Sequence, residues 1–350
     1  MQIPRTASAP VQLLGRLLEH EAPGDAVVAL PPEPGLPLLF EEVLPGAQYV
    51  HLDYAVYRSD RELQRTIPGS VDPIFAEEWG TVRPANWAAI FLPKEKALAE
   101  WVFAGLAARL LPGARVRVVG ENRGGIRSAK PMIEAAVGPV KGSRSGRHAV
   151  LWDAVRAEAP SPPRDLRREF EFQAGGEILR AVSYPGVFSH GEFDPGTRLL
   201  LESLGRPQYR RALDWGCGAG VIGAYLLRLC PGALVDLVDS HALALRSARE
   251  TLLANGFPSD RVYASDGFAD VRGSFDLIVA NPPFHAGIKT RLSVTERMIR
   301  DSARYLLPGG RLVLVANTFL RYPAVLRECY RNVRVLAETA SFRVFEAMQE

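Results

Sequence analysis

The sequence predicts an α/β fold made of two tandem Rossmann-like domains, the N-terminal one degenerate. In the C-terminal half, short apolar runs alternate with helical patterns, and a glycine-rich loop follows the first of these runs. The N-terminal half repeats part of this pattern, since RLLPGARVRVV (residues 109–119) resembles YLLPGGRLVLV (residues 305–315). Each copy follows an amphipathic helix, which itself follows a short strand that ends at a proline. The alternative is two unrelated α/β domains that share an LLPG turn.

The length and composition suit two soluble domains. The chain has 350 residues, 47% of them hydrophobic, and a formal charge of +3, which permits a nucleic-acid partner without requiring one. A polar, proline-rich linker is expected at residues 157–165, which gives domains at 1–160 and 161–350. The three cysteines have no CxxC spacing, so no metal site is expected. No signal-peptide core or membrane-length apolar run is present, and we expect a cytoplasmic protein.

The N-terminal half has the elements of a Rossmann-like domain but not its cofactor loop. We expect helices at Val11–Glu19 and Lys96–Leu111, and strands at Ala26–Leu30, near Gln48–His51, at Ala88–Leu92 and at Ala114–Val119. The first strand leads into PPEPG (residues 31–35), and prolines have no N–H group to offer a ligand. This copy is therefore predicted to have lost the cofactor and substrate chemistry.

The glycine loop of the C-terminal half has the pattern of a nucleotide-cofactor site. A strand leads into DWGCGAG (residues 214–220), and a helix is expected at Val221–Leu229. The next strand, Leu234–Asp239, ends in an acid suited to ribose hydroxyls, and a third, Arg261–Ser265, is followed by Asp266. Either acid alone could be a cap or turn residue. In this order, with the motif described next, they are typical of class I S-adenosylmethionine-dependent methyltransferases.

The motif NPPF (residues 281–284) follows the apolar strand Phe275–Ala280. The two prolines end the strand and stiffen the backbone, so the side-chain oxygen of Asn281 and the carbonyl of Pro282 can both accept hydrogen bonds from one planar –NH2 group. Phe284 offers a flat face for a heteroaromatic ring. We predict Asn281, Pro282 and Phe284 as catalytic residues, with Asn281 also beside the cofactor. The alternative is a Pro-Pro turn after a core strand.

Two further features concern the nucleic acid. His285 could be a general base, although a role in contacting RNA is favoured over it. Residues 115–147 hold eight Lys or Arg against two Glu, several of them among glycines and serines that suit phosphate contacts. Arg123, Arg127 and Lys130 are the RNA-contact candidates. The alternative is an ordinary solvated surface.

Four blocks together resemble the RsmC family of bacterial methyltransferases, which modify a guanine exocyclic amine in small-subunit (16S) ribosomal RNA. They are GENRGGIRSA (120–129), GVFSHGEFDPGTRLLL (186–201), LDWGCGAGVIG (213–223) and NPPFHAGIKT (281–290). The resemblance covers most of the chain. Trp215 departs from it, since a small or aliphatic residue is expected there.

The resemblance implies S-adenosyl-L-methionine as the cofactor and ribosomal RNA as the partner, within the small subunit or an assembly intermediate. It gives the methionine end of the cofactor to Asp214, Gly216, Gly218 and Gly220, the ribose to Asp239, and the adenine amine to Asp266. Phe188 and Asp194 would lie in a segment that folds over the cofactor.

Three other functions fit parts of the sequence. Methylation of a large-subunit ribosomal RNA guanine would use the same pocket. A protein glutamine N-methyltransferase would also present an –NH2 group to NPPF, but the basic loops argue against it. A non-enzymatic ribosome-assembly protein that binds RNA is disfavoured by the intact glycines and acids of the second half.

Overall fold

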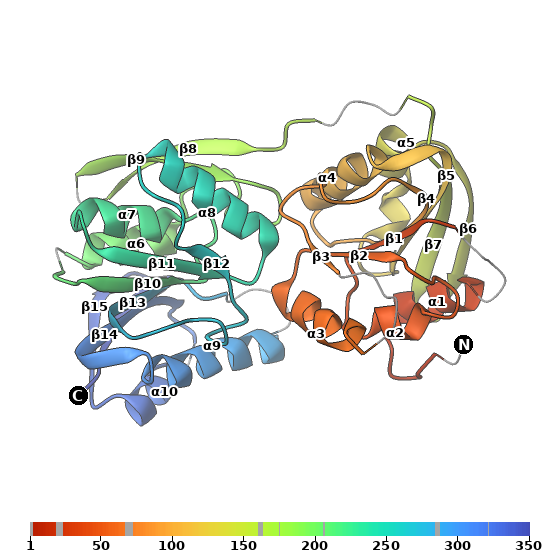
Figure 1. Ribbon diagram of the computed structural model, residues 1–350. Coiled ribbons are helices and arrows are strands. Elements are labelled where there is room, and N and C mark those ends of the chain that lie inside the picture. The colour runs from red at the N-terminus through yellow and green to blue at the C-terminus, as the bar shows by residue number, and fades with distance from the viewer. Residues whose placement is uncertain are drawn as a thin grey trace. The chain divides into compact units, whose positions relative to one another are not determined.

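The computed structural model describes residues 3–18, 24–66, 73–159, 164–174, 176–205, 207–283, 288–320 and 322–350. The chain divides into two compact units, Met1–Leu166 and Arg167–Glu350 (Figure 1). Each unit contains a mixed sheet with helices packed against it, as expected for α/β domains.

The helical elements of the first unit are α1 (Ala9–Leu18), α2 (Leu36–Phe40), α3 (Tyr54–Gln64), α4 (Lys96–Ala107), the 3-10 turn η1 (Ile126–Ser128) and α5 (Lys130–Ala136). Its strands are β1 (Ala26–Ala29), β2 (Gln48–His51), β3 (Ile74–Phe75), β4 (Ala85–Phe91), β5 (Leu110–Glu121), β6 (Val140–Gly146) and β7 (Ala149–Val155). Helices α1 and α2 bury their apolar faces against the sheet in one core cluster.

The second unit begins with a hairpin of β8 (Arg168–Ala174) and β9 (Glu177–Ser183). Its helices are α6 (Pro195–Ser203), α7 (Val221–Leu229), α8 (Ala242–Ala254), α9 (Ile288–Ser302) and α10 (Tyr322–Cys329). Its sheet contains β10 (Arg211–Trp215), β11 (Leu234–Asp239), β12 (Val262–Ala264), β13 (Phe275–Ala280), β14 (Leu306–Asn317), β15 (Asn332–Glu338) and β16 (Phe342–Met348).

The two sheets have the same topology. Their strand orders are β3-β2-β1-β4-β5-β7-β6 and β12-β11-β10-β13-β14-β16-β15, and in each the first five strands are parallel while the last two pair antiparallel. The pairing of the fourth and fifth strands also skips residues at the same place in both sheets, between pairs Ala85–Leu110 and Trp87–Arg115 in the first sheet, and between Phe275–Leu306 and Leu277–Arg311 in the second. The tandem repeat predicted from the sequence is therefore confirmed.

This shared irregularity explains an error in the sequence prediction. We expected a helix to run from Lys96 to Leu111, but α4 ends at Ala107 and β5 begins at Leu110. Leu110 is buried and pairs with Ala85 of β4, and Gly113 then takes a left-handed conformation at φ 79°. The helical periodicity of the sequence continues into the first residues of β5, but pairing with β4 holds these residues in the sheet.

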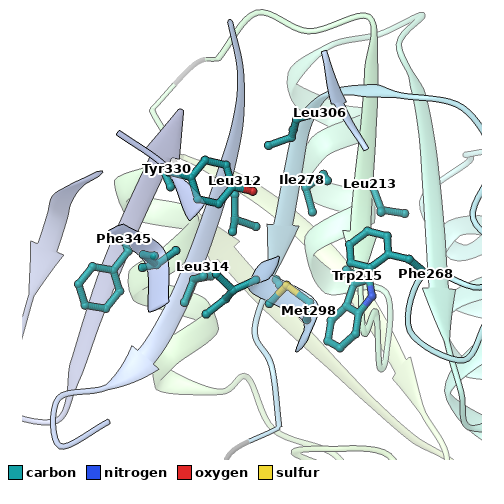
Figure 2. Packing of buried hydrophobic residues seen from close by; sticks show 14 of the residues in the cluster. Leu213, Trp215, Phe268, Ile278, Met298, Leu306, Leu312, Leu314, Tyr330 and Phe345 are labelled. Carbon is teal, nitrogen blue, oxygen red and sulfur yellow. The ribbon is translucent and has the colours of Figure 1, made fainter. Parts of the chain in front are cut away.

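One core cluster of the second unit lies between its sheet and helices α9 and α10. Leu213, Ile278, Leu312 and Leu314 point from the strands into this cluster, where Met298 meets them from α9 (Figure 2). Trp215 belongs to the same core and stacks on Phe268 with ring centroids 6.1 Å apart. Because side chains alternate along a strand, Asp214 faces the opposite side, where α7 packs.

Candidate active site

Three strands of the second sheet end side by side at one edge. Trp215, the last residue of β10, pairs with Val238 of β11 and with Ala280 of β13. The residues that follow these three are Gly216, Asp239 and Asn281. Three of the residues singled out from the sequence thus meet at the carboxyl edge of a parallel sheet, which is where ligands bind in open α/β folds.

The glycine loop has two open positions and one packed position. Gly216, Gly218 and Gly220 all have positive φ values, of 71°, 52° and 75°. A Cβ added at Gly216 would meet no atom within 4 Å, and one at Gly218 would meet only Val187, at 3.9 Å. A Cβ at Gly220 would lie 2.8 Å from the Cα of Ala248. The first two glycines therefore leave space for a ligand, whereas Gly220 lets α7 approach α8.

Asp214 is fully buried beneath this loop. Its Oδ2 accepts a hydrogen bond from the Gly223 amide at 2.8 Å, and its Oδ1 has no hydrogen-bond partner among the described residues. Burial raises the pKa of Asp214 to about 8, although the Gly223 bond acts in the other direction. A cation placed at the loop would stabilise the ionised form of this carboxylate.

Asp239 links the glycine loop to the start of α8. Its Oδ2 accepts from the Gly218 amide at 2.9 Å, and its Oδ1 accepts from the His241 amide at 2.9 Å. Burial raises the pKa of Asp239 above its ordinary value, against these two bonds. Asp266 follows the neighbouring strand β12, is partly exposed, and has Arg297 at 3.9 Å.

Asn281 is held by two side chains at the start of α6. Its Nδ2 donates to Thr197 Oγ1 at 2.8 Å and to Asp194 Oδ2 at 3.0 Å, and Asp194 in turn caps α6 through the Thr197 amide at 2.6 Å. These bonds use the amide nitrogen of Asn281, so its Oδ1 is left as an acceptor. That oxygen is buried and has no hydrogen-bond partner among the described residues. It is oriented to receive a donor from a ligand.

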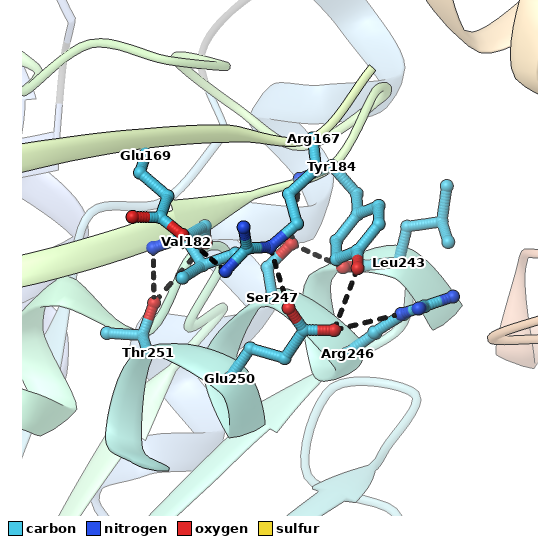
Figure 3. A network of polar contacts seen from close by, with 9 residues as sticks. All are labelled: Arg167, Glu169, Val182, Tyr184, Leu243, Arg246, Ser247, Glu250 and Thr251. Carbon is cyan, nitrogen blue, oxygen red and sulfur yellow. Dashed lines mark hydrogen bonds and ion pairs between the residues drawn. The ribbon is translucent and has the colours of Figure 1, made fainter. Parts of the chain in front are cut away.

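The segment between β9 and α6 is anchored on α8. Tyr184 donates its hydroxyl to Glu250 at 2.8 Å, and Glu250 also binds Arg167 at 3.0 Å and Arg246 at 3.1 Å (Figure 3). The Tyr184 amide donates to Ser247 at 3.0 Å. Burial, with the Glu250 bond, raises the pKa of Tyr184 to about 12, so the hydroxyl remains a donor at neutral pH. This network fixes the start of the segment whose Val187 lies against Gly218.

Other residues named from the sequence fall in different places. Phe188, in the same segment, is 46% exposed. Pro282 is buried, while Phe284 and His285 lie outside the described residues. Thr197 was not identified from the sequence, although the pattern DPGT (194–197) contains a signal for it. An Asp followed by Pro is typical of a helix start, and the third helical residue then lies next to the capping Asp.

The equivalent place in the first unit is filled by the chain's own side chains. Ala29 pairs with Val50 and Ile90, so Leu30, His51 and Phe91 correspond to Gly216, Asp239 and Asn281. The strand register thus aligns Phe91 with Asn281, and β4 ends at Phe91, one residue before the end of the predicted strand Ala88–Leu92. Leu30 keeps the left-handed backbone of Gly216, with φ 58°, and its amide donates to Val50 O at 2.8 Å as that of Gly216 does to Val238 O at 2.9 Å. A leucine side chain therefore enters the direction that is open in the second unit.

His51 completes the closure of this first site. It is 1% exposed, and its Nε2 lies 3.4 Å from Oδ2 of the buried Asp60. Burial lowers the pKa of His51 to about 3 and raises that of Asp60 to about 6, so His51 is neutral at physiological pH. The first unit therefore has a buried neutral ring at the position where the second unit has the carboxylate of Asp239.

The basic segment of the first unit is divided between surface and interior. Arg123, Arg127 and Lys130 are exposed, on the turn after β5, on η1 and at the start of α5. Lys130 lies 3.8 Å from Glu134, an exposed pair of little energetic weight. Arg117, counted among the eight basic residues of the segment, is only 5% exposed and lies 3.3 Å from Asp153. It therefore does not belong to an RNA-contact surface.

The second unit fits a cofactor that combines a cation, a ribose and a carboxylate. The open space at Gly216 and Gly218, the unpaired Oδ1 of Asp214 and the partly exposed Asp239 would hold these groups. In the described part of the chain, no group of three or more His, Cys, Asp or Glu side chains could hold a metal ion. Nor is any described helix long and apolar enough to cross a bilayer.

Comparison with known proteins identifies the family. Residues 179–346 match the model of the methyltransferase small domain, and residues 26–168 match that of its N-terminal companion domain. Over 345 residues, 98% of this chain and 99% of the relative, the sequence is 34% identical to Ribosomal RNA small subunit methyltransferase C of Aliivibrio salmonicida (strain LFI1238). The chain belongs to the RsmC family. The relative of Pseudomonas aeruginosa (strain UCBPP-PA14) is 42% identical over 262 residues, 74% of this chain and 78% of its own.

A solved structure of the RsmC family has the same architecture. The T. thermophilus 16S rRNA N2 methyltransferase (RsmC), in complex with AdoMet and guanosine, superposes with a TM-score of 0.82 at 25% identity, and the match covers 99% of this chain and 93% of that one. The prediction of two tandem methyltransferase domains is therefore confirmed.

Proposed function

We infer that this chain is an S-adenosylmethionine-dependent methyltransferase that modifies the exocyclic N2 amine of a guanine in 16S ribosomal RNA. Its membership of the RsmC family supports the reaction and the substrate class. The observation that carries the chemistry is Asn281, whose Nδ2 is fully engaged by Asp194 and Thr197 and whose Oδ1 is left buried and unpaired beside the glycine loop.

Asn281 would act by orienting the target amine. The lone pair of a guanine amine is delocalised into the ring, so the nitrogen is a weak nucleophile. A hydrogen bond from the amine to Asn281 Oδ1, with a second to the Pro282 carbonyl, would hold the nitrogen in position and favour a more tetrahedral geometry. S-adenosylmethionine, when bound, supplies the electrophilic methyl group. The methylated nitrogen becomes acidic as positive charge develops on it and would lose its proton to water, so the chain does not need a strong base.

The residues around the glycine loop would hold the cofactor. We assign the methionine end to Asp214, Gly216 and Gly218, the ribose to Asp239 and the adenine amine to Asp266. Gly220 supports the loop indirectly, because its missing side chain allows the close packing of α7 on Ala248. Phe284 would stack on the target base. His285 would contact RNA.

The first unit would serve RNA binding instead of catalysis. Leu30 and His51 occupy the positions at which a cofactor would need open space and a carboxylate. The exposed Arg123, Arg127 and Lys130 would contact phosphates of ribosomal RNA, within the small subunit or an assembly intermediate, in the cytoplasm.

Mass mapping of methylguanosines in ribosomal RNA tests this function. RNA from cells with and without the gene should differ by one N2-methylguanosine in 16S rRNA, and the purified protein should restore it. A difference confined to large-subunit RNA would indicate the alternative substrate. Unchanged RNA together with a lost methylglutamine would indicate a protein substrate. Restoration of ribosome assembly by the Asn281→Ala variant, with no methyl transfer, would indicate an RNA-binding protein that is not an enzyme.

A further inference from the structure

Phe319 is an aromatic residue that the core does not use. Its side chain is 74% exposed, the highest value among the exposed large apolar residues of the described chain. It lies in the turn after β14, between the end of that strand and the start of α10 at Tyr322. Exposing a large aromatic side chain to water is unfavourable, so its position requires an explanation.

The turn that carries Phe319 is held firmly. The Thr318 amide donates to Ser341 O at 3.0 Å, its hydroxyl donates to Ala340 O at 3.2 Å, and the Leu320 amide donates to Asn317 O at 3.0 Å. Leu320 packs against the core of the second unit. The residues on both sides of Phe319 are thus fixed, and its ring is presented to solvent by a defined backbone.

This turn lies at the same edge of the sheet as Asn281. Ala280 pairs with Leu314 in the parallel neighbour β14, so Asn281 is level with Val315, and Asn317 lies two residues further out, about 7 Å along the strand. The start of α6 connects the two places. Asn317 pairs with Phe342, whose ring lies 3.1 Å from the position of a Cβ built on Gly196. Gly196 lies between Asp194, the N-cap of α6, and Thr197, the two residues that hold Asn281.

The same turn occurs in the first unit with a different exposed residue. There the Asn122 amide donates to His148 O at 2.8 Å and the Gly124 amide donates to Glu121 O at 2.9 Å, bonds that correspond to those of Thr318 and Leu320. The residue between them is Arg123 instead of an aromatic residue. The unit with the open cofactor site therefore exposes a flat ring at this turn, while the unit with the closed site exposes a guanidinium.

We propose that Phe319 stacks on an unpaired nucleobase next to the target guanine. This inference rests on the proposed function. A guanine must leave its base stack before its amine can reach Asn281, and its neighbour then loses one stacking partner. A fixed aromatic ring beyond Asn281 on the same edge can take that place. Asn317 and Thr318 precede the ring, which is 74% exposed, and its flat face offers the area of one base.

The test is steady-state methylation of small ribosomal subunits and of 16S rRNA, both from cells that lack the gene. Phe319→Ala should lower kcat/KM about 5- to 150-fold, mainly through KM, the range found for losing one base–aromatic stack. Phe319→Tyr and Phe319→Trp should remain close to wild type, whereas Phe319→Leu should resemble Phe319→Ala. The affinity for S-adenosylmethionine and the Tm should be unchanged in all four variants.

Leu253→Ala is the matched control, because Leu253 is a 62% exposed apolar residue on α8 and should be silent. A Phe319→Ala variant as active as wild type would overturn the proposal. So would a fully active Phe319→Leu variant, since a contact with a protein needs apolar area but not a flat ring. A wild-type chain inactive on both substrates would refute the proposed function, and this inference with it. If wild type is active and Phe319→Ala has the same activity, the stacking proposal is refuted while the proposed function stands.

Discussion

The side-chain amide of Asn281 donates to Thr197 Oγ1 at 2.8 Å, across 84 positions of the chain. With the parallel bond to Asp194, this contact decides which end of the Asn281 amide faces the site. The nitrogen is held by α6, so the oxygen is the atom presented to a substrate. The orientation gives a direct prediction for catalysis.

Asn281→Ala should reduce methyl transfer roughly 10²-fold or more, the effect of removing one preorganised polar group, and should leave the affinity for S-adenosylmethionine nearly intact. Thr197→Val should show a smaller loss, because Asp194 still holds the amide. Single-turnover assays with calorimetry of cofactor binding would measure both. His285→Ala should be much milder, and a loss equal to that of Asn281→Ala would contradict transfer without a base.

Gly216→Leu should abolish cofactor binding while the protein stays folded. The first unit shows that a leucine can occupy this left-handed position, since Leu30 has φ 58°. The matched control is Gly256→Leu, which has φ 75° and open space but follows α8, away from the site. Both variants should lose about 1–2 kcal/mol of stability from backbone strain, and only the first should lose binding. Equal cofactor affinity in the two variants would show that Gly216 does not line the cofactor site.

One molecule of S-adenosylmethionine should bind per chain. The cofactor position of the first unit contains Leu30 and the neutral, buried His51. Isothermal titration of the full chain should give a stoichiometry of one, and Asp239→Ala should remove it. A second site that survives Asp239→Ala would mean that the first unit also binds cofactor.

Cofactor affinity should rise with pH up to about 8, in part through Asp214. Burial raises the pKa of this carboxyl to about 8, so the cofactor-free protein holds a proton that a cation would expel. Proton release upon binding means tighter binding as pH rises through this pKa. Asp214→Asn should flatten the dependence. The cofactor's own ionisable groups affect both proteins equally, so the difference in log affinity between wild type and Asp214→Asn reports Asp214 alone. Equal slopes of log affinity against pH in the two proteins, from pH 6 to 9, would refute the role of Asp214.

The raised pKa of Asp214 also makes the stability of the cofactor-free protein depend on pH. Because the folded-state pKa of Asp214 is raised above the unfolded value near 3.8, its contribution to stability is fully present below pH 4. It is lost as pH rises toward 8. Urea unfolding of the cofactor-free protein should therefore show a steeper decline over this window in wild type than in Asp214→Asn.

Charge reversal at Arg123, Arg127 and Lys130 should weaken RNA binding and make it less sensitive to salt. Each lost phosphate contact should lower the slope of log affinity against log salt by about one unit. Filter binding at a series of salt concentrations measures this slope. Charge reversal at Arg117 is not a suitable control, because that side chain is buried. Reversal at Arg228, on α7 of the second unit, is the comparison variant. An unaltered slope in the triple variant would support a scaffold role for the first unit.

Much of the fold and half of the site follow from local pattern. The bounds of α7, β11 and β13 were predicted to the residue, because each is a short apolar run bordered by glycine, proline or acid. The ends of those strands carry Gly216, Asp239 and Asn281, and parallel pairing brings strand ends together whatever the rest of the chain does. The repeat of LLPG likewise predicted a shared topology, which both sheets have.

The sequence by itself determined which strands are followed by functional residues, because glycine, proline and strand periodicity determine backbone conformation over only a few residues. Only the tertiary structure decided what the distant neighbours of those residues do. It oriented Asn281 through Thr197, and it gave Gly220 a packing role against Ala248. It also buried Arg117 beside Asp153. These outcomes depend on contacts between residues tens of positions apart. A local sequence pattern cannot predict such contacts, because the packing of the helices on the sheet brings the residues together.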